Sequence, residues 1–294
     1  MSELVSNANS SLPEGVEIVT RQVKLNHLKN KPRYWHHDDP FMSHLINAAS
    51  IFLPEGERFF IRSFLYFINE VDDETLRNEI KEFVTQEGIH GDEHSKFNQD
   101  LIDNLGYDFL ETSELRIKQI FAFYNRFTSK KFQLAITLSA EHFTAIIAEM
   151  VLRNPQLMEG VEPKYLELWH WHLMEELEHK GVAMDLYNAV DGSYWKRCVA
   201  IVLILSSIVP YIGFVFYKLL KQDGMISKEL WRKQKLYHKG NSPVFRQLWV
   251  DFKSFFKRGF HPWQHDNSDL IVELNTQFYK QGIIKRLPKS TSAA

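Results

Sequence analysis

The chain has 294 residues, 44% of them hydrophobic, and a formal charge of -2. This composition excludes an intrinsically disordered chain and leaves room for one large domain or for a domain with an appendage. The single cysteine, Cys198, excludes an intramolecular disulfide and a cysteine-based zinc site, and it indicates a reducing compartment such as the cytoplasm.

Charged residues are distributed unevenly along the chain. Residues 1–197 contain 20 basic and 31 acidic side chains, whereas residues 198–294 contain 15 and 6. The difference indicates two units with different surroundings, or alternatively a basic tail that docks on an acidic domain. Residues 1–24 lack the basic segment and apolar run of a secretory signal, and we expect them to form a flexible tail.

Residues 25–197 have the pattern of an all-α bundle. Apolar residues recur at spacings of three and four, and no long stretch alternates with period two. Proline and glycine residues punctuate the pattern and mark helix boundaries. We expect helices between Pro40 and Pro54 and over residues 54–70, 74–105, 113–127, 130–153 and 163–189. The fold class that follows is a ferritin-like four-helix bundle with extra helices.

An apolar segment follows at residues 198–220. Its first 20 residues carry no charge, which is about the length that crosses a bilayer core. Pro210 lies at its middle and predicts two half-helices, 199–209 and 211–220, in a re-entrant or interfacial hairpin with both ends on the cytoplasmic side. The alternative is a buried helix pair that packs against the bundle.

Residues 221–294 form a basic, aromatic-rich region in which tryptophan and phenylalanine are interleaved with lysine and arginine. This combination is typical of the membrane interface. We therefore expect a cytoplasmic protein that binds the inner face of the cell membrane. No recognition motif accompanies the basic residues, so we expect no binding to nucleic acid.

Four of the predicted helices each carry one glutamate on an otherwise apolar stripe: Glu57, Glu87, Glu141 and Glu176. A buried carboxylate requires a partner because burial of an unpaired charge is costly. His90 follows Glu87 by three residues, and His172 and His179 share a 60° arc of their helix with Glu176.

The order Glu, Glu-x-x-His, Glu, His-x3-Glu-x-x-His is the ligand pattern of dinuclear carboxylate bundles. Four carboxylates balance the charge of two divalent ions, and neutral imidazoles complete the coordination without adding charge. We predict two iron ions, with manganese or zinc as alternatives, because histidine-rich apolar sites suit iron. The predicted ligands are Glu57, Glu87, His90, Glu141, His172, Glu176 and His179.

Several neighbouring side chains are interpreted differently. Glu167 and His170 also have the Glu-x-x-His spacing, but they point to another face of their helix. His94 lies only 20° from the direction of Glu87 and is either a further ligand or a donor behind one. Glu175 and Glu178 point away from Glu176, and we expect them behind the ligands or in solvent.

The blocks PEGERFF, QEGIHGDEH, AEHFTAIIAE and WHLMEELEHKGVAMDLY resemble a bacterial family called predicted metal-dependent hydrolases, over roughly residues 20–200. The order and spacing of the predicted ligands are also similar to those of the di-iron arylamine N-oxygenases related to p-aminobenzoate N-oxygenase. That second resemblance implies a di-iron centre with three histidines and four carboxylates, and it implies nothing about the substrate.

Three functions are compatible with these residues. The leading one is a non-haem di-iron oxygenase that uses O₂ to oxidise an organic, lipophilic substrate and takes electrons from a protein such as a ferredoxin. A metal-dependent hydrolase that uses a metal-bound hydroxide is the first alternative. Metal storage or peroxide detoxification without catalysis is the second, although it leaves the basic, aromatic region unexplained.

Overall fold

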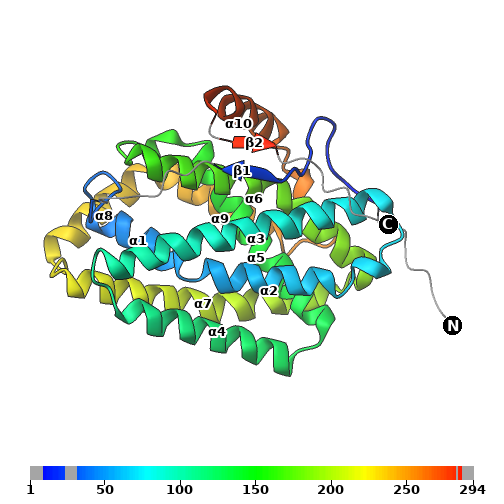
Figure 1. Cartoon of the computed structure of the whole chain (residues 1–294), viewed down its shortest axis with the longest axis horizontal. Coiled ribbons are helices and arrows are strands. Elements are labelled where there is room, and N and C mark those ends of the chain that lie inside the picture. Colours follow the sequence, from blue (N-terminus) through cyan, green and yellow to red (C-terminus); the bar gives the residue numbers. More distant parts are fainter. Residues whose placement is uncertain (1–8, 24–31, 283, 287–294) are drawn as a thin grey trace.

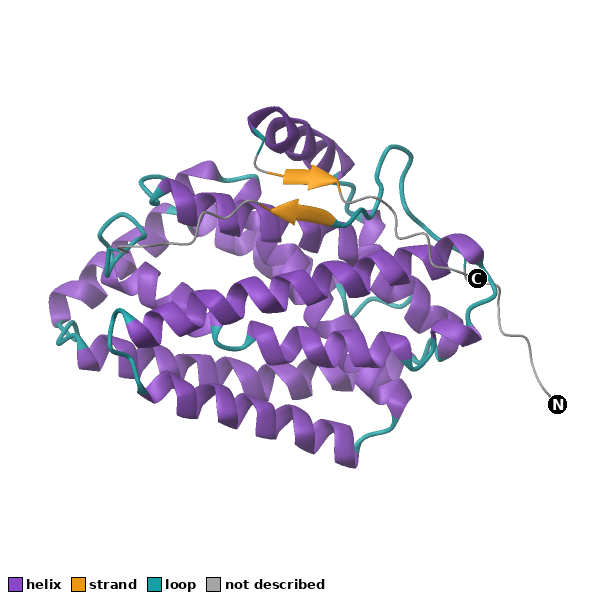
Figure 2. Cartoon of the chain, in the orientation of Figure 1, coloured by secondary structure: helices purple, strands orange, loops and turns teal. Residues whose placement is uncertain are grey.

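The computed structural model describes residues 9–23, 32–282 and 284–286, and most of these residues are helical (Figures 1 and 2). The central four-helix bundle consists of α2 (Leu53–Leu65), α3 (Glu74–Asp103), α5 (Lys130–Leu152) and α6 (Pro163–Val190). Helix α2 packs against α3 and α5, and α6 packs against the same two helices from the other side. The prediction of an all-α, ferritin-like bundle is confirmed.

Local signals in the sequence account for where these helices begin. The side chain of Asp73 accepts a hydrogen bond from the backbone N–H of Leu76 at the start of α3, and Ser129 accepts one from Phe132 at the start of α5. Such caps satisfy backbone donors that a helix start leaves free. The second predicted helix ends earlier than expected, at Leu65, and the short 3₁₀ helix η1 (Ile68–Glu70) follows it.

Two further helices flank the bundle. Helix α1 (Pro40–Ser50) packs against α7 and α3, and α4 (Phe109–Phe127) packs against α2, α3 and α5. The 3₁₀ helix η2 (Pro155–Met158) connects α5 to α6. The helices predicted over residues 113–127 and 130–153 are therefore present as α4 and α5, although α4 starts four residues before the predicted position.

Helix α7 (Tyr194–Gln222) is one continuous helix that includes Pro210, so the predicted hairpin of two half-helices is wrong. Pro210 lies on the exposed side of α7, and so does Ser206, whose carbonyl Pro210 leaves without a backbone N–H partner. The opposite side of α7 packs along α5 and α1. The alternative prediction, that this segment packs against the bundle, agrees with the structure, but the segment is one helix and not a pair.

The chain continues through α8 (Lys228–Gly240), α9 (Ser242–Ser254), the 3₁₀ helix η3 (Pro262–Gln264) and α10 (Ser268–Gln281). Strand β2 (Ile284–Arg286) then pairs antiparallel with β1 (Arg21–Val23), with Arg21 opposite Arg286. Figure 2 shows this two-stranded ribbon over one side of the bundle, next to α10.

The flexible tail predicted for residues 1–24 is wrong for residues 9–23. Val16 and Ile18 are buried in the same core as the bundle helices, and Arg21 is almost completely buried. Apolar and charged contacts with α3 and α6 hold this segment, and its composition alone does not indicate them. Residues 1–8 lie outside the described part of the chain.

Two of the described helices, α5 and α7, are long and apolar enough to cross a membrane. In α5, 67% of the most apolar window is buried, because this helix is a core element of the bundle. In α7 only 33% of the corresponding window is buried. The apolar composition of α5 is explained by its place in the core, whereas burial does not explain that of α7. Of these two helices, α7 is the one that presents a wide apolar surface.

Candidate metal centre

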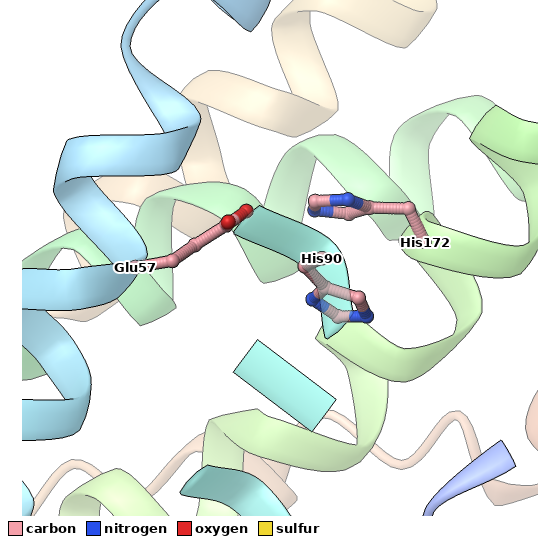
Figure 3. A group of neighbouring side chains, drawn as sticks. All are labelled: Glu57, His90 and His172. Atoms are coloured by element: carbon pink, nitrogen blue, oxygen red, sulfur yellow. The ribbon is translucent and has the colours of Figure 1, made fainter. Parts of the chain in front are cut away.

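The seven predicted ligands converge in the middle of the four-helix bundle. Helix α2 supplies Glu57, α3 supplies Glu87 and His90, α5 supplies Glu141, and α6 supplies His172, Glu176 and His179. All seven side chains are buried. Figure 3 shows Glu57 reaching from its helix toward the rings of His90 and His172.

These side chains form two adjoining groups. Ligand atoms of Glu57, His90 and His172 lie within 4.8 Å of one another, and so do those of Glu87, Glu176 and His179. The seventh residue, Glu141, places Oε2 3.6 Å from Nδ1 of His179. The two groups of carboxylate and imidazole atoms lie next to each other, and this arrangement is compatible with two neighbouring metal ions.

Glu176 occupies the position between the two groups. Its Oε1 lies 3.1 Å from Nε2 of His172, 3.8 Å from Nδ1 of His90 and 3.9 Å from Nδ1 of His179. Nδ1 of His179 is also 2.8 Å from Oε1 of Glu87. One carboxylate oxygen therefore faces three imidazole nitrogens, so Glu176 could contribute to holding ions in either group.

Hydrogen bonds on the outer side fix the tautomers of His90 and His179. Nε2 of His90 donates to Glu175 at 2.9 Å, and Nε2 of His179 donates to Oε1 of Gln86 at 3.0 Å. Burial lowers the pKa of both histidines, so both rings are neutral. Their Nδ1 atoms are consequently unprotonated and point inward, as metal binding requires.

A series of hydrogen bonds through Asn98, Ser50 and His94 fixes the tautomer of the third histidine, His172. The Ser50 hydroxyl donates to Asn98 Oδ1 at 2.8 Å, so it accepts from Nδ1 of His94 at 3.0 Å. Nε2 of His94 then has only a lone pair to offer and accepts from Nδ1 of His172 at 2.7 Å. Both ring nitrogens of His94 are thus hydrogen-bonded, one of them to the predicted ligand His172, so His94 is not available as an eighth ligand, and Nε2 of His172 faces the centre.

The carboxylate oxygens and imidazole nitrogens that face the centre require a cation between them. In the part of the chain that the structure describes, no hydrogen bond reaches either carboxylate oxygen of Glu57 or Glu141, or Nδ1 of His90. An imidazole lone pair and a carboxylate oxygen repel one another unless a proton or a metal ion lies between them. Burial raises the pKa of Glu176, but its hydrogen bond and charge interactions with His172 and the other two histidines outweigh burial and lower it to about 2. The donor set therefore fits divalent metal ions.

Burial raises the pKa of Glu57, Glu87 and Glu141 well above the usual value, and repulsion between these carboxylates and Glu176 raises it further. In the metal-free protein their contribution to stability is present in acid and is lost as the pH rises through the raised values. Bound metal removes this penalty because it pairs with the ionised forms.

We accordingly expect the melting temperature of metal-free protein to fall between about pH 5 and about pH 8. The increase that added Fe(II), Mn(II) or Zn(II) produces should grow over the same interval. Differential scanning calorimetry with chelator and with metal at both pH values measures this. A metal-induced increase that shrinks with rising pH would contradict the assignment of these carboxylates as ligands.

Arg21 and Gln86 bind side chains that surround the predicted ligands. The sequence alone does not indicate either role. Arg21 binds Glu175 at 2.9 Å and Glu178 at 2.6 Å, and Gln86 donates to Glu178 at 3.1 Å and to the carbonyl of Val19 at 3.2 Å. Glu175 and Glu178 are thus buried and lie behind the ligands, as one of the two sequence-based interpretations has it.

An all-α bundle with buried carboxylate and imidazole donors from four helices defines a candidate dinuclear metal protein. The chain belongs to the family described as predicted metal-dependent hydrolase, whose model matches residues 19–266. The family membership that the four sequence blocks indicate is thereby confirmed, and the match covers most of the chain. Comparisons with curated proteins and with solved structures find no match, and the similarity to the di-iron N-oxygenases stays a prediction.

Proposed function

We propose that this protein is a metal-dependent enzyme that binds two iron ions and uses O₂ to oxidise an organic substrate. The observation that carries the proposal is the buried set of four carboxylates, one from each bundle helix, and three inward imidazole nitrogens from α3 and α6. When bound, two ferrous ions supply the electrons that reduce O₂. Electrons would have to be replaced by a separate protein such as a ferredoxin.

The protein's own residues bind, orient and shield such a centre. Glu175, Gln86 and His94 hold the three imidazoles with their lone pairs inward. Phe83 packs edge-on against His179 at 4.6 Å, and Trp171 packs edge-on against His90 at 4.8 Å between ring centroids. These aromatic walls keep bulk water away from the ligands, which protects a reactive oxidant from side reactions.

The second candidate is hydrolysis, which the description of the family favours over oxidation. The same donors can hold two ions that activate water for attack on an ester, amide or phosphate. No nucleophilic side chain is needed for this reaction. Zinc would exclude oxidation, because reduction of O₂ requires a redox-active ion, whereas O₂ uptake separates the two candidates if the ion is iron or manganese.

The test starts from metal analysis of purified protein, followed by O₂ uptake of the anaerobically reduced protein in a single turnover. We expect about two iron ions per chain and about one O₂ consumed per pair. Protein that holds zinc or manganese, takes up no O₂ and cleaves ester or phosphate substrates would establish the hydrolase. Many more iron ions per chain would establish storage. His170→Ala serves as a control because His170 lies outside the cluster.

A further inference from the structure

The outward side of α7 carries no charge over most of its length. Its exposed positions recur at three and four residues from Trp195 to Tyr217, a distance of about 33 Å along the helix. The exposed side chains are Trp195, Val199, Val202, Leu203, Ser206, Val209, Pro210, Gly213, Phe214 and Tyr217. The solvent-facing stripe of a surface helix is normally polar or charged, so this stripe has a different role.

Two neighbouring helices extend this surface. On one side, Tyr124 of α4 bonds Ser207 at 2.6 Å, and Tyr211 donates to the Ser113 carbonyl at 3.3 Å. Figure 1 shows α4 and α7 side by side along one edge of the molecule. Helix α4 adds the exposed side chains of Leu115, Phe123 and Phe127.

On its other side, α7 borders an apolar groove shared with α5 and α9. The groove has a volume of about 380 Å³ and is lined by Phe143, Ile146, Leu205, Val209, Leu248, Trp249 and Phe252. Every one of these side chains is apolar. Trp249 and the adjoining Val250 are also exposed, so α9 continues the surface beyond the groove. We call the exposed outer sides of α4, α7 and α9 the apolar face.

Arginine and lysine side chains lie close to the exposed aromatic rings of this face. Arg258 lies 6.0 Å from the ring of Trp195, Lys218 5.9 Å from Phe214, Lys253 5.5 Å from Trp249 and Arg126 5.4 Å from Phe127. The exposed basic residues Arg116, Lys118 and Arg246 add to this rim, whereas Glu111 is the exposed acidic residue on α4. Aromatic rings beside basic groups around an apolar middle match the headgroup region of a bilayer.

From this geometry we propose that the apolar face docks the protein onto a bilayer that contains anionic phospholipid. Val202 and its neighbours enter the boundary between headgroups and acyl chains, and the basic rim pairs with lipid phosphates. The inner side of α7 stays packed on α5 and α1, so the helix lies in the interface and does not span the membrane. The proposal does not depend on which reaction the metal centre performs.

The test is flotation of the full-length protein with vesicles of phosphatidylcholine alone or with about 30% phosphatidylglycerol. We expect the protein to float with the anionic vesicles at about 0.1 M salt and to float less at higher salt or without anionic lipid. Val202→Glu places a charge in the middle of the face and should reduce bound protein at least about tenfold.

Val272→Glu is the matched control, because Val272 is an exposed valine on α10, on the other side of the bundle from α4 and α7 (Figure 1). It should float like the unaltered protein, and equal melting temperatures of the two variants show that both are folded. Equal flotation of both variants would overturn the proposal, as would unaltered protein that stays soluble with anionic vesicles. Self-association that Val202→Glu abolishes, without vesicle binding, would assign the face to a second copy of the chain.

Discussion

Replacing Arg21 with leucine is expected to destabilise the fold by about 3–5 kcal/mol, because it leaves buried carboxylates without their cation. Arg21 holds Glu175 and Glu178 through ion pairs that are 2% exposed or less. Although burial lowers it, the attraction of these two glutamates raises the pKa of Arg21 above its usual value. The free energy of unfolding is measured by denaturant titration with chelator present, so that metal binding does not contribute.

Arg153→Leu provides the comparison, because Arg153 also pairs with two acidic residues, Glu149 and Asp269, at the surface. Exposed ion pairs contribute about 0–1 kcal/mol. An Arg21→Leu effect no larger than that of Arg153→Leu would show that Glu175 and Glu178 do not depend on Arg21. Arg21→Lys should retain part of the stability, because lysine keeps the charge but cannot form the same fork of hydrogen bonds.

His172→Ala and Glu176→Ala should each abolish stoichiometric metal binding and activity. Glu176 faces all three histidines, and Nε2 of His172 is its nearest nitrogen. Loss of either residue leaves the remaining ligands too few to hold both ions, and it leaves unpaired carboxylates behind. Metal content after gel filtration and the dissociation constant from calorimetry are the measurements.

Glu167→Ala and His170→Ala are the matched variants on the same helix, because they carry the same three-residue spacing on another face. Both should retain metal. Comparable loss of metal from the two sets would mean that α6 presents a different face to the ions. Melting temperatures do not replace metal analysis here, because removing one buried carboxylate also relieves repulsion in the metal-free protein.

The cluster of seven residues could be predicted because each of them lies on a helix whose own sequence indicates which side is buried. Glu57 and Glu141 stand alone among apolar neighbours at helical spacing, and the structure buries both. Short connections make α2 and α3 neighbours and α5 and α6 neighbours, and packing of the two pairs against each other then brings the glutamates together. Periodicity within a helix was thus enough to select the seven residues that meet.

The parts that were missed depend on contacts between distant segments. Arg21 lies on a three-residue strand whose partner begins at Ile284, and no local pattern in residues 1–24 predicts that pairing. Gln86 is a polar residue next to a ligand, and its role becomes visible only once Glu178 and His179 are placed. Pro210 misled for another reason: proline disfavours a helix interior, but packing against α5 and α1 holds α7 together around it.

The ribbon of β1 and β2 has a consequence for the order of events during synthesis. Arg21 is synthesised before the bundle helices, yet the strand that pairs with β1 is completed only at Arg286, and Asn275 of α10, which contacts Glu178, is also made after them. A nascent chain that has already formed α2, α3, α5 and α6 holds the partners of His90 and His179, Glu175 and Gln86, but lacks the strand that pairs with Arg21 behind Glu175 and Glu178. We expect the support of Glu175 and Glu178 by Arg21, and with it tight metal binding, to be complete only after β2 has been made.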